Sequence, residues 1–175
     1  MMRSTSPCRP SHIARWNGYK TVQIRRATRD DAQTVYDLRK AAILAQCTGC
    51  YPAADLDIWT AGPMSDAFAA NIAARCHVVE VDGEVVGMGM LDVTSGQVDA
   101  VFVRPDAMGK GVGRAMMGFV EQQARELGLT QLCLDSTLNA APFYRSVGFS
   151  GDAVSVYESP RGISLACIPM IKQLV

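Results

Sequence analysis

The chain has 175 residues, of which 49% are apolar and 19% are charged. This length predicts one domain with a short tail, large enough to bury a core without disulfide or metal support. Basic and acidic residues balance at 17 each, which argues against a nucleic-acid-binding protein that relies on bulk positive charge, and no apolar run reaches the length of a membrane span.

The first residues differ in charge from the rest of the chain. Residues 1–20 contain no acidic residue, and their charged side chains are Arg3, Arg9, Arg15 and Lys20. They lack the continuous apolar segment of a secretory signal. We expect a flexible N-terminal extension or an upstream start site rather than an organelle transit peptide. Function is therefore sought in residues 21–175, which we expect to form one domain.

The first half of this domain predicts one strand followed by helices. Residues 21–27 alternate in the manner of a strand. Thr28 and Asp31 then have the spacing of a capping box, which predicts the start of a helix. Prolines and glycines interrupt residues 49–63, where we expect an irregular segment with a short helical piece. Ser65 can cap a further helix.

The second half predicts strands interrupted by two helices. Asp82-Gly83 stands between two alternating apolar runs, which is a strong signal for a β-hairpin. We expect strands at residues 77–81, 84–93, 98–103, 129–134, 149–157 and 163–171. Helices are expected from the glycine turn at 109–113 to Gly128, and at 139–147. Hairpins combined with strand–helix–strand units predict an α/β fold, in which a mixed sheet carries helices on both faces.

Six cysteines are present, and two of them form a C-x-x-C motif at Cys47 and Cys50. This motif can indicate a redox pair or half of a metal site. A zinc site would need a second close pair, and Cys76 is adjacent to His77 rather than spaced from it. We therefore favour reduced structural thiols and expect no metal. A redox protein would instead predict a disulfide between Cys47 and Cys50.

Three alternating glycines stand where a predicted strand passes into a helix, at positions 109, 111 and 113. Glycine permits positive φ and close approach of an anion, and the first N–H groups of a helix are unpaired at the positive end of its dipole. The turn therefore predicts a pyrophosphate site, with packing alone as the other interpretation. Lys110 and Arg114 add positive charge. The spacing fits neither a Walker A loop nor a dinucleotide-binding fingerprint.

A second segment follows, which begins with Asn139 and ends in Phe-Tyr-x-x-x-Gly-Phe. Together the two segments resemble the GCN5-related N-acetyltransferase (GNAT) superfamily, whose members transfer an acyl group from acyl-CoA to an amine. The family's glycine turn, Gln/Arg-x-x-Gly-x-Gly/Ala, is matched at Gly111 and Gly113. Its second segment is matched at Asn139, Phe143, Tyr144, Gly148 and Phe149. The resemblance extends from about Val22 to the C-terminus and implies a mostly antiparallel, twisted sheet.

The resemblance implies acetyl-CoA as the cofactor. Its diphosphate would rest on the turn, at Met108, Gly109, Lys110, Gly111, Val112, Gly113 and Arg114. Its pantetheine arm would pair with the backbone of Val101, Phe102 and Val103, beside Asn139, Phe143 and Tyr144. Met108 departs from the usual Gln or Arg, but the position contributes mainly its backbone, so we expect weaker polar anchoring rather than loss of binding.

The resemblance and the chemistry of acyl transfer also suggest catalytic residues. Tyr144 is the candidate general acid, because the departing thiolate needs a proton and a phenol has a pKa close to that of an alkyl thiol. An alternative is a core aromatic with a satisfied hydroxyl. Asp99 is the candidate base, since alternation along its strand places it on the face of Val101. Glu80, Asp92 and ordered water remain open as bases.

Tyr51 and Trp59 lie in the irregular segment that would border the acceptor cleft, where they line an acceptor pocket or close the core.

The sequence thus predicts an acyl-CoA-dependent N-acetyltransferase, acting on a primary amine by direct transfer in a ternary complex. The alternative is a non-catalytic CoA-binding or sensing module. We expect a small-molecule or peptide acceptor, a cytoplasmic location and neither nucleic acid nor membrane as a partner. A homodimer is expected only by analogy with relatives.

Overall fold

The structure is a computed structural model that describes residues 22–175. The basic extension expected at residues 1–20 lies outside the described residues. Across the described range, no helix is long and apolar enough to cross a membrane.

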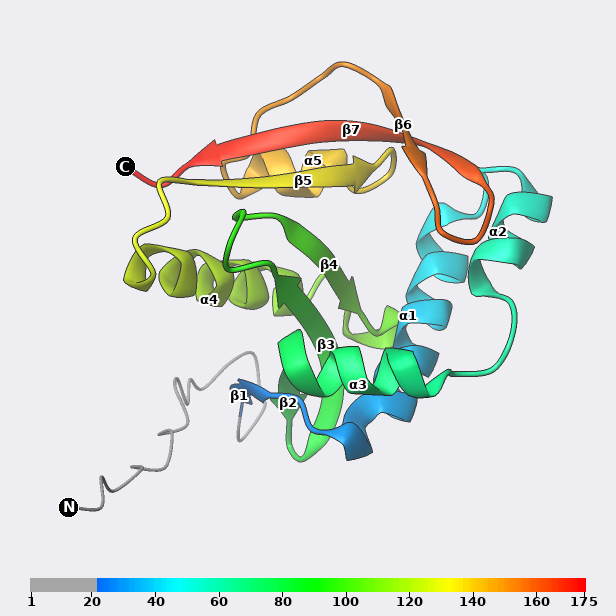
Figure 1. The fold of residues 1–175 in the computed structure, drawn as a ribbon, viewed down its shortest axis with the longest axis horizontal. Coiled ribbons are helices and arrows are strands. Elements are labelled where there is room, and N and C mark those ends of the chain that lie inside the picture. The colour runs from blue at the N-terminus through cyan, green and yellow to red at the C-terminus, as the bar shows by residue number, and fades with distance from the viewer. Residues whose placement is uncertain (1–21) are drawn as a thin grey trace.

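The elements follow the predicted order, with a short helix in the interrupted segment (Figure 1). The strands are β1 (Val22–Arg26), β2 (Cys76–Val81), β3 (Glu84–Leu91), β4 (Val98–Val103), β5 (Gln131–Thr137), β6 (Ser155–Glu158) and β7 (Ser164–Gln173). The α-helices are α1 (Ala32–Cys47), α2 (Ala53–Thr60), α3 (Asp66–Arg75), α4 (Val112–Glu126) and α5 (Ala141–Ser146). Short 3-10 helices, η1 (Arg29–Asp31) and η2 (Pro105–Ala107), precede α1 and α4.

The strands form two antiparallel sheets, ordered β1-β2-β3-β4 and β5-β7-β6. The two sheets meet at one isolated parallel bridge, between Gln97 and Cys133. Beyond that bridge, β4 pairs with β3 on one side and with no described strand on the other. Antiparallel pairing within each sheet and parallel contact between them give the predicted mixed, mostly antiparallel arrangement, and they leave an open edge on β4.

Local sequence signals produce the predicted starts and turns. Thr28 and Asp31 form the capping box, in which the Asp31 carboxylate accepts the Thr28 N–H at 2.7 Å. The Ser65 hydroxyl accepts the Phe68 N–H at 3.1 Å and caps α3. Asp82 and Gly83 both have positive φ, +49° and +86°, as a tight two-residue hairpin turn requires.

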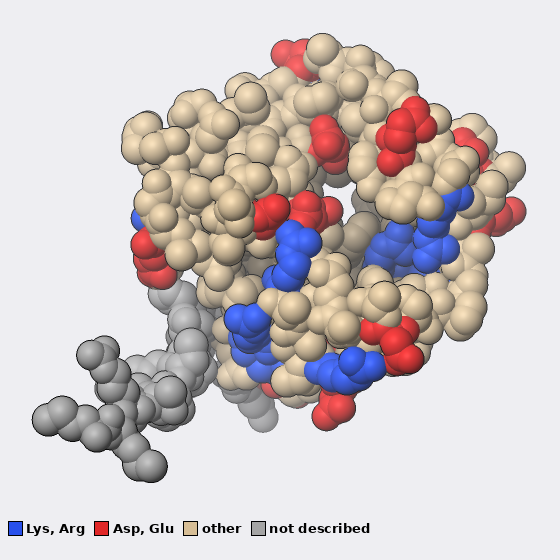
Figure 2. All heavy atoms as spheres, in the orientation of Figure 1, with Lys and Arg blue, Asp and Glu red and all other residues tan. Residues whose placement is uncertain are grey.

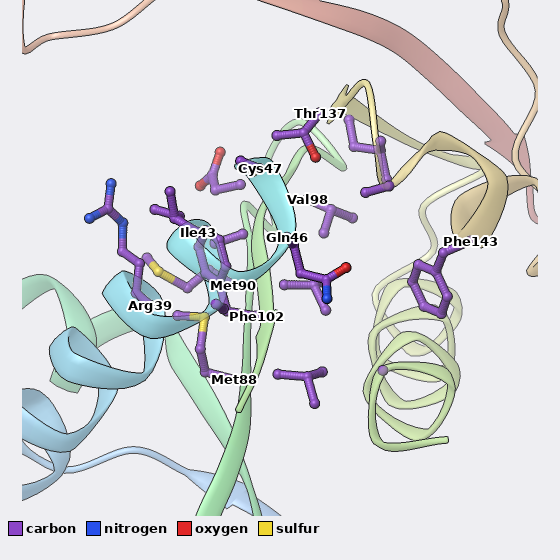
Figure 3. A pocket seen from close by; sticks show the side chains of 18 of the residues that line it. Arg39, Ile43, Gln46, Cys47, Met88, Met90, Val98, Phe102, Thr137 and Phe143 are labelled. Atoms are coloured by element: carbon purple, nitrogen blue, oxygen red, sulfur yellow. The ribbon is translucent and has the colours of Figure 1, made fainter. Parts of the chain in front are cut away.

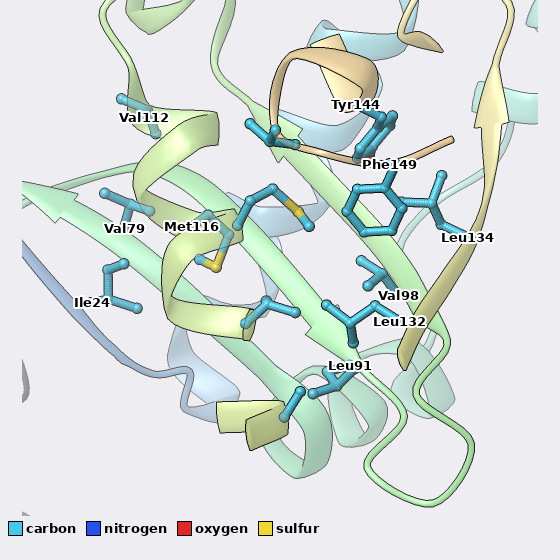
Figure 4. Close-up of a cluster of buried hydrophobic side chains, with 14 of the residues drawn as sticks. Ile24, Val79, Leu91, Val98, Val112, Met116, Leu132, Leu134, Tyr144 and Phe149 are labelled. Atoms are coloured by element: carbon cyan, nitrogen blue, oxygen red, sulfur yellow. The ribbon is translucent and has the colours of Figure 1, made fainter. Parts of the chain in front are cut away.

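Helices cover both faces of the first sheet, and each face has its own hydrophobic cluster. Val101 and Val103 of β4 pack with the cluster beneath α4, which Figure 4 shows. Ala100 and Phe102 alternate with them and pack with the cluster beneath α1 and α3. The alternation explains why β4 is half-buried on both faces. It also places the open edge of β4 between two helical layers.

Two glycines of β3 set how closely α4 approaches the sheet. A Cβ atom on Gly87 would lie 2.7 Å from Val112 Cγ1, and one on Gly89 would lie 2.6 Å from Met116 Sδ. Real Cβ contacts do not come this close, so a larger residue would have to displace the Val112 or Met116 side chain of α4. These glycines therefore fix the N-terminal turn of α4 directly against the sheet.

Two predicted strands differ most from the structure in their bounds. The strand expected at 149–157 is a single bridge from Ser150 to Ile171, followed by the short strand β6. Gly151, whose Cβ would lie 2.2 Å from the Pro169 carbonyl oxygen, turns the chain away from β7 at this point. The strand expected at 129–134 instead begins at Gln131 and continues to Thr137.

Candidate functional site

A cavity of about 980 Å³ occupies the space between β4, β5 and α1. Figure 2 shows a hollow at this place, with basic and acidic side chains beside it. Its walls include almost every residue proposed from the sequence: Tyr51, Trp59, Asp99, Val101, Phe102, Val103, Met108, Gly109, Gly111, Val112, Gly113, Arg114, Asn139, Phe143 and Tyr144. Lys110 is exposed and does not line the cavity. Segments distant in sequence thus converge on one site.

The glycine turn has the backbone geometry of an anion cradle. Gly109 and Gly111 have φ of +71° and +82°, a region that L side chains rarely adopt, and Gly111 is the N-cap of α4. In the described part of the chain, the N–H groups of Gly111, Val112 and Gly113 donate no hydrogen bond. These bare donors lie at the positive end of the α4 dipole, where a phosphate group is favoured.

Side chains around the turn keep this cradle open. A Cβ on Gly113 would lie 3.1 Å from Phe143 Cζ, so only glycine leaves the space between the helix and that ring free. Arg114 is exposed and donates to the carbonyl and hydroxyl oxygens of Ser146 at 3.4 and 3.3 Å. The Met108 thioether lies 2.9 Å from Gln46 Nε2, which ties the turn to α1.

Tyr144 places a phenol at the wall of the cavity. Its ring packs edge-on against Phe143 and Phe149, with centroids 5.1 and 5.8 Å apart. Its hydroxyl forms no hydrogen bond within residues 22–175, and no fully enclosed side-chain oxygen there lacks a partner, so the hydroxyl opens into the cavity. Burial raises the pKa of Tyr144 to about 12. The phenol therefore holds its proton firmly at neutral pH.

Asp99 lies at a bulge in β4, because the residues on either side of it pair with consecutive residues of β3. Its carboxylate forms an ion pair with Arg75 at the end of α3. The predicted alternation that put Asp99 on the face of Val101 is therefore wrong, since a bulge shifts the side-chain pattern by one residue. Asp99 nevertheless lines the cavity.

The other two acids considered as bases lie elsewhere. Glu80 accepts a hydrogen bond from Arg25 at 2.7 Å on β2. Asp92 accepts the Thr94 N–H at 2.8 Å in the β3–β4 turn. Neither carboxylate lines the cavity, whereas Asp135 of β5, which sequence reasoning missed, does.

Tyr51 and Trp59 combine the two roles that the sequence left open. The Tyr51 hydroxyl accepts the Leu138 N–H at 3.0 Å and donates to the Ala166 carbonyl at 2.6 Å. The Tyr51 ring is buried and packs edge-on against the Trp59 ring, with the two ring centroids 6.2 Å apart. Both rings also line the cavity, so they close the core and form part of its wall.

The C-x-x-C motif lies at the end of α1. Cys47 and Cys50 are both free thiols, and the Cys47 thiol donates to Asn139 Oδ1 at 3.5 Å. Burial raises the pKa of Cys47 to about 11, which disfavours the thiolate that redox chemistry needs. Within residues 22–175, no group of three or more His, Cys, Asp or Glu side chains could hold a metal ion.

One face of α1 contributes side chains that the sequence reasoning did not assign. These residues recur at the spacing of a single helical face, and they are Arg39, Ala42, Ile43, Gln46 and Cys47. The same periodicity supplies the core residues of α1, which is why it could not separate cavity lining from packing. A charged residue within that apolar stripe was the one signal available.

Residues 73–151 match the family model of the acetyltransferase (GNAT) domain. This stretch, which is a little under half of the chain, is similar to the GCN5-related N-acetyltransferase superfamily. The matched range contains β4, the glycine turn, α4 and α5, which are the parts of this GNAT domain that carry the open strand edge, the cradle and Tyr144.

Known proteins extend this likeness beyond the matched range. An IAA acetyltransferase from Azospirillum brasilense is 34% identical over 83 residues, covering 43% of this chain and 54% of that protein, so the chain spans about half of its length. A GCN5-related N-acetyltransferase from Rhodopseudomonas palustris has a TM-score of 0.79 at 23% identity, covering 96% and 99% of the two chains. The yncA protein of Salmonella typhimurium, whose structure includes its cofactor acetyl-CoA, has a TM-score of 0.64 at 26% identity, covering 88% and 94%. These similarities confirm the predicted family and fold class.

Proposed function

We propose that this GNAT domain binds acetyl-CoA and transfers its acetyl group to a primary amine. The diphosphate would rest on the turn from Gly109 to Arg114, where the N–H groups of Gly111, Val112 and Gly113 donate no hydrogen bond within the described residues. The pantetheine arm would lie along the open edge of β4, where Val101 and Val103 offer backbone groups without a strand partner, as added strands use elsewhere. Asn139 and Phe143, which line the same cavity, would border the arm.

Transfer would occur directly between the two bound substrates. The amine nitrogen forms a bond to the thioester carbonyl carbon, and the carbon–sulfur bond breaks with its electron pair on sulfur. A β4 N–H near Val101 would stabilise the developing oxyanion. No residue needs to carry the acetyl group in this reaction. Cys133 does not line the cavity and donates a hydrogen bond to Gln97 Oε1, and the Cys47 thiol donates to Asn139 Oδ1.

Tyr144 would donate the proton that the departing sulfur requires. A pKa of about 12 makes this phenol a weaker acid than a solvated thiol. The leaving thiolate would itself be desolvated in the same apolar space, which raises its own pKa and restores the match. The position of the hydroxyl, free and open to the cavity, supports this role more strongly than its acidity does.

Asp99 is the proposed base that takes the proton from the attacking amine. Asp99 lines the cavity, and its carboxylate is held in place by the ion pair with Arg75. Because Arg75 already engages one carboxylate oxygen, part of the proton loss would pass to solvent. A cytoplasmic location and a homodimer remain predictions.

The observation that carries this proposal is the convergence of unpaired helix N–H groups, an unpaired strand edge and a free phenol on one cavity. Calorimetry with CoA and thiol release from acetyl-CoA with a panel of primary amines would test it. Gly113→Leu should abolish CoA uptake, because the side chain would meet Phe143. Gly118→Leu, on an exposed part of the same helix with no atom near its Cβ, should retain uptake.

The outcomes separate the two functions predicted from the sequence. Absence of CoA uptake by the unmodified chain would refute both. Uptake without thiol release for any amine would favour a non-catalytic CoA-binding module over an N-acetyltransferase.

A further inference from the structure

Arg39 of α1 stands out among the arginines of the described residues. Those that lack a carboxylate partner are Arg26, Arg39, Arg114 and Arg161. Arg26, Arg114 and Arg161 are exposed, and of these Arg114 lines the cavity, at the glycine turn. Arg39 is partly buried and lines the cavity on α1, while Arg75, which also lines it, is paired with Asp99. Arg39 is therefore a cavity cation whose charge nothing in residues 22–175 balances by an ion pair.

The residues around Arg39 hold its guanidinium in place but leave most of its N–H donors without a hydrogen-bond acceptor. Its guanidinium carbon lies 6.0 Å from the ring centroids of both Trp59 and Phe102. Its hydrogen bonds go to the Trp59 carbonyl oxygen alone, at 3.4 and 3.5 Å, which is long for such bonds. Two aromatic faces thus orient a guanidinium that retains most of its donors for another group.

Electrostatics point to an anionic partner. Burial lowers the pKa of Arg39, and the positive charge of Arg161 lowers it further. An arginine keeps its proton despite such shifts, so the folded protein holds an uncompensated charge at this wall. A bound anion would relieve the cost of that charge.

The location of Arg39 separates it from the proposed diphosphate site. Gln46, which contacts Met108 of the turn, lies seven residues further along α1, a rise of about 10 Å. Figure 3 shows Arg39 and Phe143 on opposite sides of the cavity, with the Phe143 side belonging to α5 and the turn. An anion at Arg39 would therefore belong to the second substrate.

We infer that the amine acceptor of this domain carries a carboxylate, which pairs with Arg39 while its amino group faces Tyr144 and the open edge of β4. This inference rests on the proposed acetyl transfer. A planar guanidinium matches a carboxylate in a two-pronged pair. A phosphate dianion would call for a second unpaired cation beside Arg39, whereas Arg161 does not line the cavity and Arg114 lines it at the glycine turn, where the diphosphate would rest. The neighbouring Trp59 and Phe102 rings suit an acceptor with an apolar body.

Matched acceptors test the inference directly. Phenylalanine, phenylalaninamide and phenethylamine share one apolar body, and only the first carries a carboxylate. We expect the unmodified chain to favour phenylalanine by about tenfold or more in kcat/KM, after correction for the fraction of free amine. Arg39→Gln should raise the KM for phenylalanine by about 10–100-fold and leave the KM for acetyl-CoA unchanged. Arg39→Lys should recover part of the loss.

Two controls keep a structural role apart from a binding role. Arg29→Gln, at an exposed ion pair outside the cavity, should change neither KM. An Arg39→Gln variant that loses activity equally with phenylalanine and phenylalaninamide would overturn the inference, as would equal use of the two acceptors by the unmodified chain. A phosphonate analogue of phenylalanine that outperforms the carboxylate would overturn it as well.

Calorimetry with N-acetylphenylalanine and its amide, in the presence of CoA, gives an answer without turnover. Tighter binding of the carboxylate, lost in Arg39→Gln, would uphold the anion site even if no amine released thiol, in which case the proposed transfer alone would fail. Equal affinity for acid and amide would reject the anion site even if acetyl transfer were demonstrated.

Discussion

The proposed cofactor half of the cavity is made mainly of backbone, whereas the proposed acceptor half is made of side chains. The cofactor half comprises β4 from Val101 to Val103, the turn from Met108 to Arg114, and the start of α5. The acceptor half comprises Arg39 of α1, Tyr51 between α1 and α2, Trp59 of α2 and Tyr157 of β6. Backbone N–H groups can bind the part of a ligand that does not vary, whatever side chains surround them. The difference suggests where specificity would lie: backbone conformation would set recognition of the proposed acyl donor, and side-chain identity would set recognition of the proposed acceptor.

Tyr144 stands where the two halves meet, and its removal should have the largest effect. Tyr144→Phe should lower kcat by about 10²–10⁴-fold, because the departing sulfur loses its proton donor. The KM for the acceptor and the calorimetric affinity for CoA should stay within about twofold, since the ring packing is kept. A rate equal to that of the unmodified chain would show that Tyr144 belongs to the core alone.

Asp99 should matter less and in a manner that depends on pH. Asp99→Asn should lower kcat/KM by about 10–100-fold at pH 7, where the acceptor amine is mostly protonated. The loss should shrink as the pH approaches the pKa of the amine, because solvent then removes the proton. A pH–rate profile of both proteins measures this. A loss that is constant with pH would assign Asp99 to positioning through Arg75 rather than to proton transfer.

Loss of the Tyr51 hydroxyl, in the acceptor half, should lower the free energy of unfolding. Tyr51→Phe leaves the partly buried Leu138 N–H and Ala166 carbonyl without their partner. We expect about 1–3 kcal/mol less free energy of unfolding in a urea titration. Tyr36→Phe, which removes a hydroxyl bonded to the Gly62 carbonyl at 2.7 Å away from the cavity, is the matched comparison. An unchanged midpoint for Tyr51→Phe would contradict a linking role.

The contrast between the halves also explains what the sequence could predict. The cradle followed from glycines at 109, 111 and 113, because positive φ at a strand-to-helix turn restricts the residue type directly. The capping box at Thr28 and the Asp82-Gly83 hairpin were predictable for the same local reason. Each of these features depends on a few neighbouring residues.

Features that depend on distant segments were not accessible in this way. The bulge at Asp99 arises from how β3 and β4 pair, and period-two alternation cannot reveal it. The partner of Asp99 is Arg75, and Trp59 and Phe102 flank Arg39, so each site is assembled by tertiary packing. The free state of the Tyr144 hydroxyl is likewise a property of the folded cavity.

Tyr144 should also leave a signature in stability at alkaline pH. Its pKa is about 12 in the folded chain and near 10 when unfolded, because burial disfavours the phenolate. As the pH rises, the unfolded state therefore releases the Tyr144 proton first. The free energy of unfolding is unaffected by this group well below pH 10, and it falls as the pH rises from 10 toward 12. By pH 11 the loss should be about 1 kcal/mol, from the linkage of one group. Urea titrations at pH 8 and 11 should show a smaller alkaline loss for Tyr144→Phe, whereas identical losses would mean that the phenol is solvated in the folded chain.

The smallest effect compares two glycines on the same helix. Gly111→Ala should cost about 1 kcal/mol of unfolding free energy, since alanine is strained at a φ of +82°, and it should weaken CoA binding because the turn shifts. Gly118→Ala lies in the exposed interior of α4 with open space at its Cβ, so it should gain about 0.5–1 kcal/mol and leave CoA binding unchanged. Opposite signs in thermal or urea unfolding would show that the backbone conformation at Gly111, and not glycine content in α4, shapes the cofactor half. A stabilising Gly111→Ala that still binds CoA would remove the conformational basis of the cradle.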